Sequence, residues 1–285
     1  MRVLVTGATG YVGRAVVREL RVHGHEPVSS RQRLLEPFGS IDADAVIHLA
    51  GLSRVRESFE DPLSYYSVNV GGTLNLLEAL QGRPFLLAST AGVYRPSDLP
   101  LTEESLREPS SPYAASKAAA EDLVAWAARS GRIGATTLRL FNVAGGGDTD
   151  TTRVITRAVA AAAGTVPGME VYGDGTSVRD FVNVRDVAAA FVVALEDCTV
   201  GESAVYNVGA TPASVRDVLG AVEEVSGRSV DVTWRPAHPG EVRFQQADVS
   251  RLHALGWKPS HSSLTEIVSD QWLASAPAPG RGPSR

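Results

Sequence analysis

Short apolar runs alternate with segments of helical periodicity along the first half of the chain. The apolar runs predict strands, and the periodic segments between them predict amphipathic helices. Strands separated by helix-length segments pair in parallel through crossover helices. The pattern therefore predicts an α/β fold with a doubly wound parallel sheet. The expected strands are residues 3–6, 27–30, 45–50, 85–89 and 135–141, and the expected helices are about 11–22, 65–81 and 113–130.

The pattern changes after residue 141, where a glycine-rich loop leads into an alanine-rich helix and then into shorter elements broken by glycine and proline. We expect a main domain over 1–165, to which 180–210 return, and a smaller C-terminal region over 166–272. The last stretch, 275–285, is rich in Pro, Gly, Ala, Ser and Arg, and this composition predicts a disordered tail.

Composition narrows the classes of function. The 285 residues carry a net charge of −5 with a pI of about 5.7, which argues against nucleic acid as a partner, since nucleic-acid binders display a basic face. No apolar run approaches the ~18 residues that suggest a membrane span, so no membrane partner is expected. The chain opens on a strand pattern without the features of a secretory signal, and we expect a cytoplasmic protein.

Metal-binding residue types are few and scattered. Cys198 is the single cysteine, and the six histidines show no ligand spacing, so we expect no metal. Arginine supplies nearly all of the positive charge, because the only lysines are Lys117 and Lys258. A lysine at 117 in such a sequence indicates a position that needs an ammonium group.

Three glycines with the spacing G-x-x-G-x-x-G follow the first predicted strand and open the first predicted helix. At such a turn, glycines let the backbone approach a pyrophosphate, which is bound by the N–H groups and the positive dipole end of the helix. The segment predicts a dinucleotide-binding loop. Its expected cofactor contacts are Gly7, Thr9, Gly10, Tyr11, Val12 and Gly13.

The end of the second predicted strand bears on the choice between NAD and NADP. An acidic residue that would bind the ribose 2′-hydroxyl of NAD is not found there, and Ser30 and Arg31 stand in its place. A guanidinium can bind a 2′-phosphate bidentately, whereas a carboxylate would repel it. Ser30 and Arg31 therefore favour NADP over NAD, although Arg31 is also compatible with a solvated turn.

A tyrosine and a lysine lie one helical turn apart at the start of the predicted helix 113–130. Tyr113 and Lys117 share one face of that helix, and Ser89 and Thr90 end the fourth predicted strand. Open α/β sheets bind their ligands at the carboxyl ends of strands. These side chains are therefore candidates for a site beside the glycine loop.

Together with the glycine loop, these motifs make the chain resemble the extended short-chain dehydrogenase/reductases, and within them the UDP-glucose 4-epimerase-like group of the NAD-dependent epimerase/dehydratase family. The resemblance covers nearly the whole chain apart from the tail and implies a Rossmann-type fold with a C-terminal substrate-binding region. Its carriers are residues 6–13, 48–51, 62–73, 89–94, 139–145 and 173–181, and the Tyr113/Lys117 pair.

The resemblance also implies roles for single residues. Thr90 would hydrogen-bond the reacting sugar oxygen, Tyr113 would act as the base and Lys117 as its partner. The substrate would be a nucleotide sugar, and two subunits would pair through the helices 65–81 and 113–130 into a homodimer. Further cofactor contacts would be Leu49, Ala50, Gly51, Asn69, Ser89, Tyr113 and Lys117, and the substrate contacts would be Ser89, Thr90, Asn142, Arg179, Arg235 and Glu241.

The chemistry agrees with these residue types. Free tyrosine has a pKa of about 10, and a neighbouring ammonium group together with a nicotinamide cation could lower this pKa by roughly 1–3 units. We expect Tyr113 to remove the proton of the sugar 4-hydroxyl while hydride moves to the nicotinamide, as in a 4-epimerase.

Several departures from the family pattern keep other functions open. The second crossover is short, the acidic ribose contact is missing, and 151–153 read Thr-Thr-Arg where asparagine is common. They favour the alternative of an NADPH-dependent ketoreductase of a nucleotide-linked keto-deoxysugar. A 4,6-dehydratase is disfavoured because Ala91 and Gly92 stand where dehydratases carry Asp-Glu. A cofactor-sensing binding protein is disfavoured because both Tyr113 and Lys117 are present.

Overall fold

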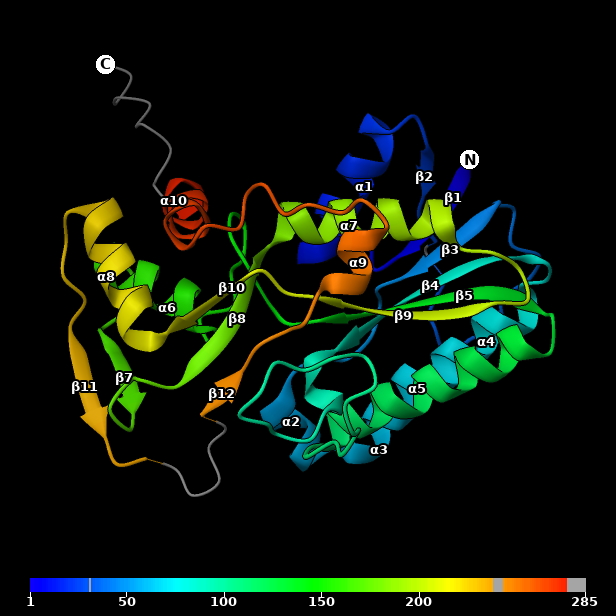
Figure 1. Cartoon of the computed structure of the whole chain (residues 1–285). Helices are drawn as coiled ribbons and strands as arrows, with labels where there is room; N and C mark the ends of the chain where they lie inside the picture. Colours follow the sequence, from blue (N-terminus) through cyan, green and yellow to red (C-terminus); the bar gives the residue numbers. More distant parts are fainter. Residues whose placement is uncertain (31, 238–242, 276–285) are drawn as a thin grey trace, which may run out of the picture.

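The computed structural model describes residues 1–30, 32–237 and 243–275, and its larger part is built on one six-stranded sheet (Figure 1). The strand order is β2-β1-β3-β4-β5-β9, and all neighbours pair in parallel. The predicted α/β class and doubly wound parallel sheet are therefore confirmed. The strands are β1 (Arg2–Thr6), β2 (Glu26–Val28), β3 (Ala45–His48), β4 (Arg83–Thr90), β5 (Ile133–Leu140) and β9 (Ser203–Val208).

Alternating strand residues bury the two faces of this sheet under different helices. One face, which includes Val3 and Val5, packs on α1 (Tyr11–Val22) and α7 (Val184–Asp197). The other face, which includes Leu4, packs on α4 (Gly72–Ala79) and α5 (Pro112–Arg129). Figure 1 shows these helix pairs on opposite sides of the sheet. The N-terminal turn of α5 lies near the carboxyl end of β4, because Tyr113 of α5 hydrogen-bonds Thr90 at the end of that strand.

The predicted helix 65–81 is longer at its start and contains an irregular turn. It follows α2 (Val55–Glu60) and begins with α3 (Pro62–Tyr66), since Asp61 accepts a hydrogen bond from the Ser64 N–H at 3.2 Å. A π-helical turn over Ser67–Gly71 joins α3 to α4. Such turns are rare and often occur at functional sites.

The second crossover is reduced, as the short spacing predicts. The described residues between β2 and β3 form turns and extended chain without a helix. The chain therefore passes from β2 at the sheet edge to β3 on the other side of β1. Ligands of open α/β sheets bind where the strand order reverses in this way.

A smaller set of elements packs beside the sheet around a separate apolar cluster that includes Ile155, Phe181 and Val222. The strands β10, β8 and β12 form one sheet with β6 paired to β8, and β7 pairs with β11. The elements are β6 (Asn142–Ala144), α6 (Val154–Ala162), β7 (Met169–Tyr172), β8 (Val178–Asn183), β10 (Thr211–Ser214), α8 (Val215–Ser226), β11 (Val232–Arg235), β12 (Phe244–Gln245) and α10 (Leu264–Ser275). Helix α9 (Ser250–Ala254) packs on the main part instead, because Leu252 belongs to its apolar cluster.

The second half of the chain contributes to both parts. Helix α7 packs on α1, and β9 pairs with β5 in the main sheet. The domain boundary predicted near residue 165 stays a prediction. The predicted tail lies outside the described residues except for Ser275, which ends α10. Within the described parts of the chain, no helix combines the length and apolar character that a membrane crossing requires.

Candidate active site

A cleft of about 910 Å³ opens at the carboxyl ends of β1, β3, β4 and β5, between the main sheet and the smaller part. Its walls bring together most of the residues that the sequence predicts for cofactor, substrate and catalysis, although these come from separate segments of the chain. The predicted residues on its walls are Gly7, Thr9, Gly10, Tyr11, Val12, Gly13, Leu49, Ala50, Gly51, Ser89, Thr90, Tyr113, Lys117, Asn142 and Arg179.

The glycine loop has the geometry that a dinucleotide requires. Gly7 has a φ of 70°, which favours glycine, and its carbonyl accepts a hydrogen bond from the Gly10 N–H at 2.9 Å. A Cβ added at Gly13 would lie 2.1 Å from the Gly7 carbonyl oxygen. Only glycine therefore allows the helix α1 to begin so close to the end of β1, and the loop fits a pyrophosphate at its N–H groups.

The turn after β3 forms the neighbouring wall. Buried His48 contacts the hydroxyls of Thr6 at 2.7 Å and Thr73 at 3.1 Å, and burial lowers the pKa of His48 to about 3. Asn69, from the π-helical turn, lies behind this wall, because its amide binds both the N–H and the carbonyl of Leu52. It also donates to Ser116 Oγ at 2.9 Å. Asn69 thus ties the cofactor side of the cleft to α5.

The catalytic candidates lie where α5 packs on the end of β4. The Tyr113 phenol hydrogen-bonds the Thr90 hydroxyl, and Lys117 Nζ donates to the Ala88 carbonyl at 3.0 Å. The buried Lys117 is also close to the turn after β3, since a Cβ added at Gly51 would lie 3.4 Å from Nζ. The phenol, the hydroxyl and the ammonium group therefore all belong to the wall of the cleft that α5 and the end of β4 form.

Burial dominates the electrostatics of this pair. It lowers the pKa of Lys117 to about 8, against the attraction of Glu121, which raises it. Burial also raises the pKa of Tyr113, which is opposite in direction to the lowered pKa expected from the sequence. The hydrogen bond with Thr90 and the charge of Arg153 act against this rise. A tyrosine base here needs further positive charge close to the phenol.

Glu121 is a residue of this site that the sequence analysis missed. It is 4% exposed, accepts a hydrogen bond from the Ser89 hydroxyl, and is paired with the equally buried Arg139 at 2.7 Å. Arg139 also donates to the Tyr94 hydroxyl at 2.8 Å. Although Ser89 lines the cleft, its hydroxyl is thus engaged with the protein. The sequence does contain a pattern that indicates Glu121, because Tyr113, Lys117 and Glu121 are spaced four residues apart along α5.

The opposite wall carries the substrate candidates Asn142 and Arg179 with charged residues that no sequence pattern indicated. The Asn142 amide donates to the Asp180 carbonyl at 3.0 Å. Arg54, from the turn before α2, and Arg153, from the turn before α6, both reach the carboxylate of Asp150, at 3.9 Å and 4.0 Å. Arg54 also pairs with Glu57 at 2.6 Å, and Arg153 donates to the buried Asp148 at 3.3 Å. Both arginines keep exposed side chains, so their ion pairs are screened more than the buried ion pair on the α5 side.

Two predicted residues, Ser30 and Arg235, lie away from the cleft wall. Ser30 is exposed beyond the end of β2, and its hydroxyl accepts from the Gln32 N–H at 3.0 Å. Arg235 is not on the cleft wall, because it ends β11 and binds Glu170 at 2.6 Å. Arg31 and Glu241 lie outside the described residues.

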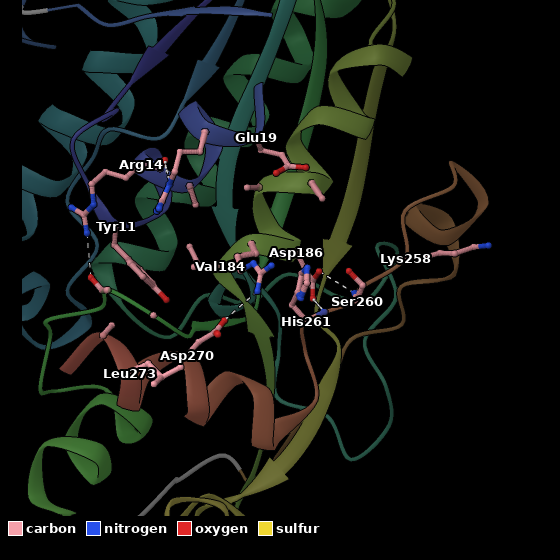
Figure 2. Close-up of a pocket in the computed structure, with 18 residues that line it drawn as sticks. Tyr11, Arg14, Glu19, Val184, Asp186, Lys258, Ser260, His261, Asp270 and Leu273 are labelled. Atoms are coloured by element: carbon pink, nitrogen blue, oxygen red, sulfur yellow. Dashed lines mark hydrogen bonds and ion pairs between the residues drawn. The ribbon is translucent and has the colours of Figure 1, made fainter. Parts of the chain in front are cut away.

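A second hollow of about 730 Å³ lies between α1, α7, α10 and residues 258–261 (Figure 2). Arg14 donates to the Thr9 carbonyl at 2.9 Å and to the Gly147 carbonyl at 3.2 Å. The buried Asp186 carboxylate accepts from the Ser260 N–H at 3.0 Å and from the His261 N–H at 2.9 Å. These contacts join the glycine loop, the main sheet and the C-terminal segment, so they serve the packing of the two parts of the molecule.

Known proteins are similar in sequence to this chain over most of its length. A model described as the NAD dependent epimerase/dehydratase family matches residues 3–209. The UDP-glucose 4-epimerase of Lacticaseibacillus casei is 30% identical and covers 95% of this chain and 96% of its own length. The GDP-6-deoxy-D-mannose reductase of Pseudomonas aeruginosa is 36% identical over 94% of this chain and 96% of its own.

A solved structure is similar over the same extent. It is the UDP-glucose-4-epimerase of Stenotrophomonas maltophila with bound NAD and formylated UDP-arabinopyranose. It has a TM-score of 0.89 and 30% sequence identity, and the match covers 96% of this chain and 97% of that chain.

Proposed function

Since the chain belongs to the NAD-dependent epimerase/dehydratase family, as its motifs predict, we propose that it is a nucleotide-sugar 4-epimerase that acts by transient oxidation to a 4-keto sugar. One observation carries this proposal: Tyr113, Thr90 and Lys117 line the same cleft as the glycine loop, and Tyr113 hydrogen-bonds Thr90. The epimerases of L. casei and S. maltophila support the choice of reaction.

The residues of the cleft provide the proton chemistry of this reaction. Tyr113 would remove the proton of the sugar 4-hydroxyl, and Thr90 would hold the same oxygen. A bound nicotinamide ring would accept the hydride from C4 and return it. Loss of one proton and one hydride converts the alcohol into a ketone, and their return to the opposite face of the turned sugar gives the epimer. The Lys117 ammonium and the nicotinamide cation would offset the effect of burial on the pKa of Tyr113.

The test is chemical analysis of the purified protein followed by turnover. We expect denatured protein to release one nicotinamide dinucleotide per chain, and UDP-glucose and UDP-galactose to interconvert without added cofactor. The alternative is an NADPH-dependent ketoreductase of a nucleotide-linked keto-deoxysugar, which the similarity to the P. aeruginosa reductase favours. Consumption of added NADPH in proportion to product, with no interconversion, would establish that reductase instead.

The choice between NAD and NADP belongs to this proposal. NAD is bound in the S. maltophila epimerase structure, whereas Ser30 and Arg31 of this chain favour NADP. If Arg31 binds a 2′-phosphate, Arg31→Ala will weaken NADP binding at least ten-fold more than NAD binding, measured by titration of the nucleotide-stripped protein. Arg33→Ala, which removes a neighbouring exposed arginine, is the control. Equal losses for both cofactors in Arg31→Ala would remove the case for NADP.

We also propose a homodimer. Large apolar side chains are exposed on the helices that the resemblance implicates, such as Leu63 on α3 (79% exposed) and Trp126 on α5 (66%). An apolar surface of this kind is typical of an interface. Light scattering should give twice the chain mass, and Leu63→Glu should lower it. The predicted cytoplasmic location stays a prediction.

A further inference from the structure

Three residues on one face of α5 hold the end of β4 at successive positions. Tyr113 hydrogen-bonds the Thr90 hydroxyl, Lys117 Nζ donates to the Ala88 carbonyl at 3.0 Å, and Glu121 accepts from the Ser89 hydroxyl. Residues four apart lie above one another on a helix, so the three side chains contact β4 from one face of α5. Tyr113 and Lys117 are the proposed base and its partner, whereas Glu121 has no role in the proposed reaction.

Glu121 is built into the protein as a fixed anion. Its carboxylate is 4% exposed and accepts hydrogen bonds from Arg139 Nε at 3.1 Å and 3.2 Å and from Arg139 Nη2 at 2.7 Å. Arg107 approaches it at 3.4 Å from the side. A carboxylate held by several donors cannot turn away, and Coulomb interactions are strong at buried positions.

Glu121 lies one helical turn from Lys117 on the same face of α5, and Arg139 from β5 and Arg107 share the charge of Glu121. On α5 the ionisable neighbours of Lys117 are Tyr113 and Glu121. On β3 the buried His48 is kept neutral, and β4 contributes the Ala88 carbonyl dipole. In the described part of the chain, Glu121 is the group whose attraction favours the charged form of the buried Lys117.

We propose that Glu121 is a positioning residue for the Tyr113/Lys117 pair. It fixes the register of α5 on β4 through Ser89, and it holds the buried Lys117 in its ammonium form. The catalytic part of this inference rests on the proposed function, since it assumes that Tyr113 and Lys117 act on a substrate. The part that concerns the charge of Lys117 can be measured without turnover.

The first experiment measures the titration of Lys117 directly. The chain contains two lysines, so protein labelled with carbon-13 at lysine Cε gives two signals, which Lys258→Arg assigns. We expect Glu121→Gln to shift the titration of Lys117 to lower pH by about one unit or more. Asp122→Asn is the matched control, because Asp122 is the next residue of α5 and pairs with Arg107 at 2.7 Å while 56% of its side chain is exposed. An unchanged Lys117 titration in folded Glu121→Gln would overturn the proposal.

The second experiment measures kcat against pH for the interconversion of nucleotide sugars. In Glu121→Gln we expect kcat to fall about 10- to 100-fold at pH 8 and KM to change less than three-fold. The loss of kcat at high pH, which follows deprotonation of Lys117, should begin at a lower pH than in wild type. Ser89→Ala removes the hydrogen bond to Glu121 but keeps the Glu121–Arg139 ion pair. It should lower kcat a few-fold without changing the pH above which kcat falls. A kcat profile equal to that of Asp122→Asn, with a shifted lysine titration, would contradict the catalytic part.

Two further outcomes, a Glu121→Gln variant that does not fold and a wild-type chain without turnover, can be told apart from failure of the inference. If Glu121→Gln does not fold because Arg139 loses its partner, Glu121→Asp keeps the charge but shortens the reach to Ser89 and Lys117. It should then show a smaller shift of the Lys117 titration in the same direction, and no shift would refute the inference. If the wild-type chain turns over no nucleotide sugar, the proposed function fails, whereas the lysine titration still decides the electrostatic role of Glu121.

Discussion

The two walls of the cleft are built in different ways. On the α5 side, Tyr113, Lys117 and Glu121 are held by hydrogen bonds to β4 and by the buried ion pair with Arg139. On the opposite side, the side chains of Arg54 and Arg153 are 59% and 42% exposed, and they pair with Glu57, Asp148 and Asp150 at 2.6–4.0 Å. The difference suggests a division of labour: a rigid wall for proton and hydride chemistry, and an adaptable wall for the sugar.

Removal of the Tyr113 hydroxyl should have the largest effect. Tyr113→Phe deletes the proposed base but keeps the ring contact with Tyr65, so turnover should fall by about 10²- to 10⁴-fold. Nucleotide content of the purified variant should equal that of wild type, because the glycine loop is untouched. Retained turnover in this variant would place the chemistry outside the rigid wall.

The charge of Lys117 should appear as a pH dependence of stability. Its pKa is about 8 in the folded protein and 10.5 when unfolded, so between these values the unfolded chain binds more protons and the free energy of unfolding rises with pH. Relative to Lys117→Met, wild type should gain on the order of 3 kcal/mol from pH 8 to pH 10.5. Urea unfolding at several pH values measures this gain. If the free energies of unfolding of wild type and Lys117→Met change in parallel with pH, as expected for the exposed Lys258→Met, folding does not lower the pKa of Lys117.

The glycine loop should tolerate no side chain at Gly13. The Cβ of Gly13→Ala would meet the Gly7 carbonyl oxygen, and we expect a loss of about 1–3 kcal/mol in unfolding free energy together with at least ten-fold weaker nucleotide binding. Gly220→Ala in α8 is the control, since an added Cβ there meets no atom within 4 Å. That variant should be more stable than wild type by about 0.5–1 kcal/mol. Normal nucleotide binding in Gly13→Ala would contradict the role of this loop.

The same contrast explains what the sequence could predict. The rigid wall follows local rules, because the glycine spacing and the four-residue period of Tyr113 and Lys117 are visible in the sequence. The π-helical turn at Asn69 and the direction of the Ser89 hydroxyl depend on packing between α5 and its neighbours. The charged residues of the opposite wall come from turns before α2 and α6, where no period connects them. Their meeting at Asp150 therefore requires the fold.

The smallest effect is expected from the contact that crosses the cleft mouth. Arg54→Gln removes the pairs with Glu57 at 2.6 Å and with Asp150 at 3.9 Å, which are exposed and screened by salt, so KM for the nucleotide sugar should rise less than about five-fold with kcat unchanged. Arg21→Gln, at an exposed arginine of α1 that is not on the cleft wall, should change neither. A loss of kcat as large as that of Glu121→Gln would mean that this wall is as preorganised as the α5 side, and the division of labour between the walls would then be wrong.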